Sequence, residues 1–183
     1  DKELCRAFEV AGAAAELVHV DALIREPSRI DGYDLIGFPG GFSYGDDIAS
    51  GRIMAALVRE KLYEPLREAV LRGCPIIGVC NGFQVLVQVG LLPGPLNGEW
   101  PRERAPQQTC ALTENAGARF MDRWVEVAVE AKSRCVWTSG LGVNVEAFDR
   151  PHAMRLPIAH GEGRFVTDAQ ATLDRLEHEG LVA

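Results

Sequence analysis

Short apolar runs alternate with helical repeats of apolar residues along most of the chain. Apolar residues three and four apart are typical of helices that cover a core, and continuous or alternating apolar runs are typical of strands. The first pattern predicts helices over residues 2–11, 53–72, 81–89 and 167–180, with a break at Pro65, an end at Gly90, and Thr167 or Asp168 as the N-cap of the last helix. The second pattern predicts strands over residues 15–20, 35–38, 74–79 and 119–131, and within 134–141 and 154–166.

The order of these elements predicts the fold class. Strands that alternate with helices, and that are nearly continuous in apolar residues, indicate an α/β protein with a mostly parallel sheet flanked by helices on both faces. In such a sheet, ligands bind at the carboxyl ends of the strands. The Gly40–Gly41 loop follows one predicted strand and Cys80 follows another, so we expect these two segments to be neighbours in space.

Composition and charge narrow the class of protein. The 183-residue chain has 47% hydrophobic residues and a net charge of −7. The length and apolar content indicate one domain with a real core, or one with a small appendage, and the charge argues against a nucleic-acid-binding protein with a basic face. The five cysteines are Cys5, Cys74, Cys80, Cys110 and Cys135. Their odd number, without a C-x-x-C pair or the Cys/His spacing of a zinc site, predicts free thiols, no metal site and a reducing cytoplasm. No run of about 18 apolar residues occurs, so we expect no membrane span.

One of these cysteines stands at the exit of a predicted buried strand, directly before a predicted helix. Gly78 and Gly82 flank Cys80 in the spacing G-x-C-x-G, which is that of a nucleophile elbow with cysteine in place of serine. A sharp turn from strand to helix strains the turn residue and raises its side chain above the sheet edge. A free cysteine is more often a small buried hydrophobic residue, which is what we expect of the other four. The turn makes Cys80 the candidate nucleophile.

A thiol nucleophile needs a base and a group that orients the base. Of the four histidines, His160 ends an apolar extended segment between glycines, whereas the other three are expected to be surface or structural residues. Residues i and i+2 of extended backbone point to the same side, so Glu162 can hydrogen-bond one imidazole nitrogen while the other faces the thiol. A lone His-x-Glu pair is more often solvated. Together with the elbow it predicts a Cys80–His160–Glu162 triad.

The developing oxyanion would need two hydrogen-bond donors. The N–H of Asn81, the residue after the nucleophile, is the first candidate. The second should come from another loop at the same sheet edge. The loop at Gly40 and Gly41 fits, because glycines let backbone N–H groups approach a substrate closely.

Three segments carry a resemblance to a known family. They are FPGGFSYGDD at residues 38–47, GVCNGFQ at 78–84 followed by GLLPG at 90–94, and PIAHGEGRF at 157–165. Together they resemble the class I, or triad-type, glutamine amidotransferases, whose fold is a flavodoxin-like three-layer sandwich. More narrowly, they resemble the glutaminase subunits of phosphoribosylformylglycinamidine synthase.

The resemblance implies hydrolysis of glutamine to glutamate and ammonia through a thioester. Cys80 would attack the side-chain amide, His160 would pass a proton to the departing ammonia, and Glu162 would hold the imidazole. Backbone N–H groups of Gly41 and Asn81 would bind the oxyanion. The same resemblance assigns glutamine binding to Gly40, Gln84, Asn115 and Arg119.

The resemblance also implies partners. Ammonia would pass to a synthetase subunit that uses ATP and Mg to convert formylglycinamide ribonucleotide to formylglycinamidine ribonucleotide in de novo purine biosynthesis, and a small accessory subunit belongs to the same complex. The sequence contains no GxxxxGK[ST] phosphate-binding loop, so we expect no cofactor in this chain and the ATP site on the partner.

The family begins with a strand before the position of residue 1 and continues past residue 183 with a His-Pro-Glu-like tail. We therefore expect residues 1–183 to be a single glutaminase domain that lacks its first strand and its C-terminal end. Three alternatives stay open: the glutaminase domain of a fused single-chain synthase, another α/β cysteine hydrolase of the same fold, and a catalytically silent regulatory or assembly domain.

Overall fold

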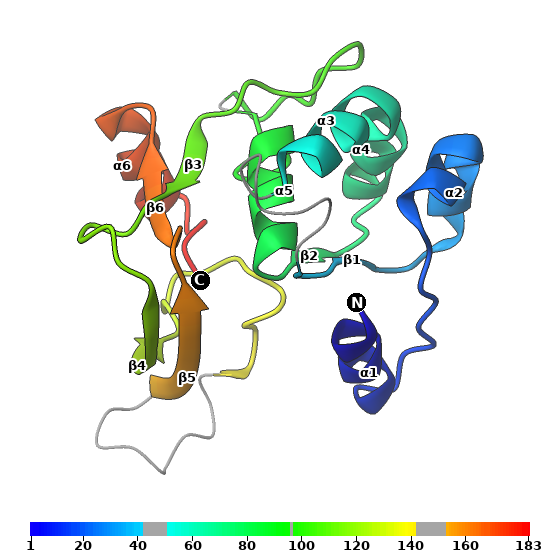
Figure 1. Cartoon of the computed structure of the whole chain (residues 1–183). Coiled ribbons are helices and arrows are strands. Elements are labelled where there is room, and N and C mark those ends of the chain that lie inside the picture. The colour runs from blue at the N-terminus through cyan, green and yellow to red at the C-terminus, as the bar shows by residue number, and fades with distance from the viewer. Residues whose placement is uncertain (42–50, 96, 142–152) are drawn as a thin grey trace. The chain divides into compact units, whose positions relative to one another are not determined.

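The computed structural model describes residues 1–41, 51–95, 97–141 and 153–183. The chain forms two compact units, Asp1–Gln108 and Thr109–Ala183, and each is described by itself (Figure 1). Within the described ranges, no helix has both the length and the apolar character needed to cross a membrane.

The first unit contains most of the helices. Its elements are α1 (Lys2–Val10), α2 (Val20–Arg25), the 3-10 helix η1 (Pro27–Gly32), β1 (Ile36–Phe38), α3 (Arg52–Lys61), α4 (Tyr63–Leu71), β2 (Ile76–Gly78) and α5 (Asn81–Val89). β1 and β2 pair in parallel, with Ile36 opposite Ile76. The helices α3, α4 and α5 bury Val58, Leu66 and Leu86 in one apolar core. Figure 1 shows these three helices on one side of the two strands and α1 on the other.

The predicted helix over residues 53–72 is two helices. The chain breaks at Leu62, whose φ of −124° is not helical, and α4 starts directly after it. Pro65 lies in the first turn of α4, where a missing N–H leaves no hydrogen bond unmade. The break was therefore predicted correctly and placed a few residues too late.

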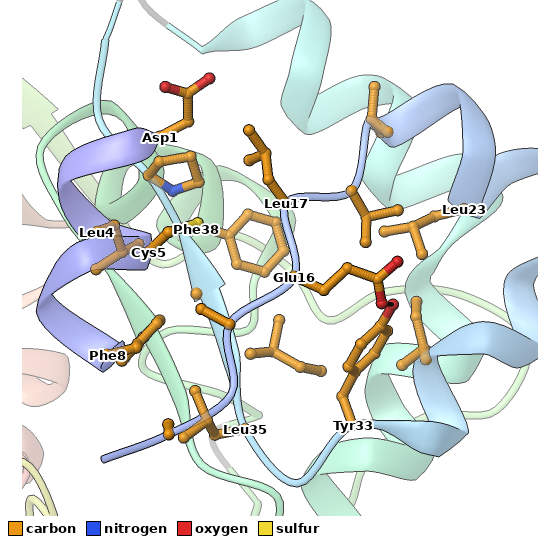
Figure 2. A pocket seen from close by; sticks show the side chains of 18 of the residues that line it. Asp1, Leu4, Cys5, Phe8, Glu16, Leu17, Leu23, Tyr33, Leu35 and Phe38 are labelled. Atoms are coloured by element: carbon orange, nitrogen blue, oxygen red, sulfur yellow. Dashed lines mark hydrogen bonds between the residues drawn. The ribbon is translucent and has the colours of Figure 1, made fainter. Parts of the chain in front are cut away.

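The predicted strand over residues 15–20 is wrong. Residues 14–18 form no regular structure, and Val20 starts α2 after His19, whose Nδ1 accepts a hydrogen bond from the N–H of Asp21 at 3.2 Å. A strand needs a neighbouring strand for its ladder, and among the described residues this segment has none. A cavity of about 540 Å³ lies between this segment, α1 and β1 instead (Figure 2).

The described part of the second unit contains two strand pairs and one helix. Its elements are β3 (Cys110–Thr113), β4 (Met121–Ala128), β5 (Ala153–His160), β6 (Arg164–Thr167) and α6 (Gln170–His178). β3 pairs with β6 and β4 with β5, both antiparallel, and Met121 lies opposite His160. The predicted strands over 119–131 and 154–166 are confirmed, the latter as two strands.

Two predictions for this unit need correction, and one strand was missed. Residues 136–140 form turns, so the strand expected within 134–141 is wrong. The N-cap of α6 is Ala169 without a side-chain bond, because Thr167 Oγ1 donates to the carbonyl of Ala169 and Asp168 Oδ1 accepts from the Thr172 hydroxyl. β3 was not predicted at all.

The α/β class is confirmed, but the sheet is only partly parallel. Among the described residues, β1–β2 is the parallel pair and the other two pairs are antiparallel. The alternation of apolar and polar residues over 119–131 is typical of antiparallel strands with one exposed face. This pattern already indicated antiparallel pairing in the second unit. The prediction was wrong in applying parallel pairing to every strand of the chain.

Candidate active site

The turn between β2 and α5 holds Cys80 in a strained conformation. Its φ of 54° and ψ of −115° lie outside the regions that residues with a side chain usually adopt. Such strain persists only where the surrounding structure enforces it, and it gathers at functional sites. The side chain of Cys80 is exposed. The thiol thus stands out of the turn, as an elbow requires, and is not a buried hydrophobic group.

The flanking glycines explain how the strain is enforced. A Cβ at Gly82 would lie 2.0 Å from the carbonyl oxygen of Phe38, at the end of β1. A Cβ at Gly78 would lie 2.8 Å from the carbonyl carbon of Gly82. These are backbone atoms, so no side chain could move aside to make room. The G-x-C-x-G spacing is therefore a consequence of β2 and α5 crossing closely beside the end of β1.

The Gly40–Gly41 loop lies against this turn, as predicted. A Cβ at Gly40 would lie 3.1 Å from the Cβ of Cys80, and the side-chain N–H of Asn81 donates to the carbonyl of Gly41 at 2.8 Å. Among the described residues, no group accepts from the backbone N–H of Gly41 or Asn81. Both donors predicted for an oxyanion are thus available beside Cys80. The rest of the FSYGDD motif, residues 42–47, lies outside the described residues.

Gln84 follows one turn after the nucleophile on α5. Its backbone N–H donates to the carbonyl of Cys80 at 3.2 Å, and its side chain is half-buried. This position on the same helix fits the predicted contact with glutamine, and that contact stays a prediction.

In the second unit, His160 is the last residue of β5 and its imidazole lies over Gly163. A Cβ at Gly163 would come within 2.1 Å of the ring, so a side chain at position 163 would force the ring to move. The Nδ1 of His160 lies 3.0 Å from Oδ1 of Asn115. The ring is thus fixed by a glycine beneath it and an amide at its edge.

Asn115 is 6% exposed, and the hydrogen bonds of its side chain all go to residues of this unit. Its Oδ1 also accepts from the N–H of Gly163 at 3.1 Å, and its Nδ2 donates to the carbonyls of Arg119 and His160 at 2.8 and 2.9 Å. Sequence reasoning assigned Asn115 and Arg119 to substrate binding. The structure places the Asn115 amide at the base of the His160 turn, while the Arg119 side chain is exposed.

Glu162 does not take the position expected from extended backbone. β5 ends at His160, and the next two residues form a bend, so the rule that i and i+2 share a side does not apply. Glu162 is exposed, and the partner at Nδ1 of His160 is Asn115 instead. Cys80 belongs to the first unit and His160 to the second, so the catalytic roles of His160 and Glu162 stay predictions.

Burial separates Cys80 from the other four thiols. Cys110 is buried, and Cys5, Cys74 and Cys135 are half-buried. Burial raises the pKa of the Cys74 and Cys110 thiols, which keeps them neutral and unreactive. Cys80 is the exposed member of the set.

Comparisons with known proteins identify the family of this chain. Residues 1–183 match the CobB/CobQ-like glutamine amidotransferase domain. The chain is 43% identical to phosphoribosylformylglycinamidine synthase subunit PurQ of Dehalococcoides mccartyi over 91% of this chain and 58% of that protein. It is 38% identical to the same subunit of Treponema denticola and 39% identical to that of Rubrobacter xylanophilus, over 100% of this chain and 65% and 68% of those proteins. The chain therefore spans about three fifths of the length of the first relatives, and it belongs to the family of CobB/CobQ-like glutamine amidotransferase domains.

Proposed function

We propose that this chain is the glutaminase part of a phosphoribosylformylglycinamidine synthase, and that it releases ammonia from glutamine for a synthetase partner. The observation that carries the proposal is the exposed thiol of Cys80 at a strained strand-to-helix turn. The identity of 34% to 43% to PurQ subunits supports the choice of substrate and pathway.

In the proposed reaction, the Cys80 thiolate attacks the carbonyl carbon of the glutamine side-chain amide. The oxygen of the tetrahedral intermediate takes up negative charge and accepts hydrogen bonds from the N–H groups of Gly41 and Asn81, each worth about 3 kcal/mol in comparable sites. The C–N bond then breaks, ammonia leaves with an added proton, and a thioester remains. Water attacks the thioester, so glutamate and the free thiol are released. Gly40 and Gln84 would contact the glutamine.

A glutamine-analogue electrophile tests the nucleophile. We expect it to modify Cys80 and to leave Cys74 and Cys110 unmodified, because those two are shielded. Peptide mapping by mass spectrometry locates the label, and Cys80→Ala should abolish both labelling and glutaminase activity. Glutamine-independent hydrolysis by the wild-type protein would favour another cysteine hydrolase of this fold. If the protein is not labelled and hydrolyses nothing, a catalytically silent assembly domain is favoured.

We propose His160 as the proton-transfer group, with Glu162 supporting it. His160→Ala should lower glutaminase activity at least about 100-fold, as loss of a general acid–base group does. His178→Ala is the matched control, because His178 is exposed on α6. Full activity in His160→Ala, with Cys80→Ala inactive, would exclude His160 as the proton-transfer group.

The proposal includes a partner that carries the ATP and Mg chemistry. Ammonia from this chain would then be consumed with formylglycinamide ribonucleotide by a synthetase subunit, in a complex that also holds a small accessory subunit. Five free cysteines support a reducing cytoplasm as the location. The test is affinity purification of the natural protein, followed by glutaminase assays with and without the ATP-binding partner. Formation of formylglycinamidine ribonucleotide only with both chains present supports the assignment.

We also propose that residues 1–183 form part of one glutaminase domain, whose sheet gains a strand in the cavity beside β1. Ile36 and Phe38 bond to the β2 side, so the alternation along β1 turns the N–H and C=O of Gly37 toward the other edge. Most of the side chains that line this space are apolar. Of the polar ones, Glu16 and Tyr33 bond to each other at 2.6 Å (Figure 2), and Asp1 and Asp34 also belong to the lining. Among the described residues, the edge of β1 that faces the cavity has no neighbouring strand, so the cavity offers an occupant a strand edge with which to pair.

Hydrogen exchange tests this strand. The amide of Gly37 should exchange quickly in a protein limited to residues 1–183 and slowly in a protein that supplies the added strand. The amide of Ile36, which donates to Pro75 at 3.0 Å, is the internal control and should be protected in both. Equal exchange of Gly37 in the two proteins would exclude the strand.

A further inference from the structure

The side chain of Asn81 links the two segments that would supply the oxyanion donors. It is 6% exposed, although asparagine is usually a surface residue. Its Nδ2 donates to the carbonyl of Gly41 at 2.8 Å. The backbone N–H of the same residue starts α5 beside Cys80. One residue therefore offers a donor through its backbone and holds the neighbouring loop through its side chain.

Among the described residues, few contacts fix Gly41 besides this bond. Its φ is 106°, a conformation that glycine adopts without strain, and a Cβ there would meet nothing within 4 Å. The residue before it is packed, since a Cβ at Gly40 would lie 3.1 Å from Cys80. The chain is thus anchored before Gly41 by packing on Cys80 and at Gly41 by the bond from Asn81.

The orientation of the Asn81 amide is set by this bond. Its Oδ1 is buried and has no hydrogen-bond partner among the described residues, and it lies 2.7 Å from where a Cβ at Gly51 would be. The nitrogen end therefore carries the side chain's interaction. Replacing that nitrogen with oxygen would set two acceptors against each other without changing the size of the side chain.

We propose that the Asn81 side chain is a positioning residue that holds the Gly41 N–H where the oxyanion forms. The inference depends on the proposed glutaminase function and deepens it. Donors for an oxyanion act only within a narrow range of distances, so a loop that is free to move loses most of its effect on the transition state. The side chain itself touches neither glutamine nor the sulfur in this proposal.

The test uses Asn81→Ala and the isosteric Asn81→Asp in the natural protein assembled with its synthetase partner. We expect kcat for glutamine hydrolysis to fall about 10- to 100-fold in both variants, with KM changed less than about threefold. The rate at which iodoacetamide alkylates Cys80 should stay within about twofold of wild type, because alkylation forms no oxyanion.

Asn97→Ala is the matched control. Asn97 is an exposed asparagine of the same unit, and its side chain also bonds once to the backbone, accepting from Glu99 at 3.1 Å. It should leave kcat unchanged. Wild-type kcat in a folded Asn81→Ala or Asn81→Asp protein would overturn the proposal, as would a parallel loss of alkylation, since that would mean the side chain supports Cys80 and not the loop. Absence of wild-type glutaminase activity would instead overturn the proposed function.

Discussion

The turns at Cys80 and His160 look alike in the sequence and are built for opposite purposes. Both place glycines close to a residue with useful chemistry. At the first turn, Gly82 has no side chain, so the backbones of α5 and β1 can pass close together, and the Cys80 thiol is exposed. At the second turn, Gly163 has no side chain, so the His160 imidazole packs against the backbone there, and its Nδ1 contacts Asn115. One turn presents its side chain, and the other encloses it.

This difference teaches that glycine spacing identifies a close approach but not what approaches. A backbone-to-backbone approach is rigid, because peptide groups in a strand and a helix cannot move separately. An approach between a backbone and a ring can relax, since the ring can rotate about its side-chain bonds. Substitutions at Gly82 and at Gly163 should therefore lower the free energy of unfolding by different amounts.

The largest effect is expected for Gly82→Ala. The new methyl group would lie 2.0 Å from the carbonyl oxygen of Phe38, so α5 would have to move away from β1. We expect the free energy of unfolding of the first unit to fall by about 3 kcal/mol or more. Urea unfolding followed by hydrogen exchange of peptides from residues 1–108 measures it.

Gly32→Ala is the control for this substitution, because a Cβ at Gly32 meets nothing within 4 Å and its φ is not positive. That variant should stay within about 0.5 kcal/mol of wild type. Equal stability of the two variants would mean that the crossing of α5 and β1 is loose, and the comparison of the two turns would then fail.

The second effect concerns the amide that encloses His160. Asn115→Ala would leave the N–H of Gly163 and the carbonyls of Arg119 and His160 without their partner. Unsatisfied buried groups cost about 1–3 kcal/mol each, and partial access of water reduces this, so we expect a loss of about 2 kcal/mol in the second unit. Hydrogen exchange of residues 109–183 in urea gives the value.

Thr113→Ala serves as its control within the same unit. The Thr113 hydroxyl is exposed and donates one bond, of 3.3 Å, to the carbonyl of Arg164. Its loss should change stability by less than about 0.5 kcal/mol. If Asn115→Ala were as mild as this, the turn at His160 would be held by something other than the buried amide.

Gly163→Ala should have a smaller effect than either. Its methyl group would come within 2.1 Å of the His160 ring, but the ring can swing away at a cost of about 1–2 kcal/mol. The swing would break the contact with Asn115. The double variant should therefore lose less stability than the sum of the losses in Gly163→Ala and Asn115→Ala. Strict additivity, measured by a double-mutant cycle, would show that the ring does not depend on both. Gly117→Ala, with open space around it, is the neutral control.

These two turns also show how far the sequence predicted the molecule. The elbow at Cys80 was predictable, because strand, turn and helix follow one another within a few residues and local sterics fix the result. The environment of His160 was not, because Asn115 is 45 residues away in sequence and no local pattern pairs them. The failure at residues 15–20 has a similar cause. An apolar run predicts a strand only if a neighbour is present to complete its ladder.

The smallest effect extends the comparison from two turns to the thiols themselves. Burial raises the pKa of Cys110 above its ordinary value of 9.0. Below that pH the thiol is neutral in both folded and unfolded chains. As the pH rises past 9.0, the unfolded thiol ionises first and stabilises the unfolded chain, so the free energy of unfolding should fall until the folded thiol ionises too. Cys110→Ala should make this alkaline decline shallower, as seen in urea midpoints measured at several values above pH 8. Parallel curves for the wild type and the variant would mean that Cys110 is more accessible to water than its 3% exposure indicates. The exposed Cys80 thiol and the buried thiols would then differ less than the geometry suggests.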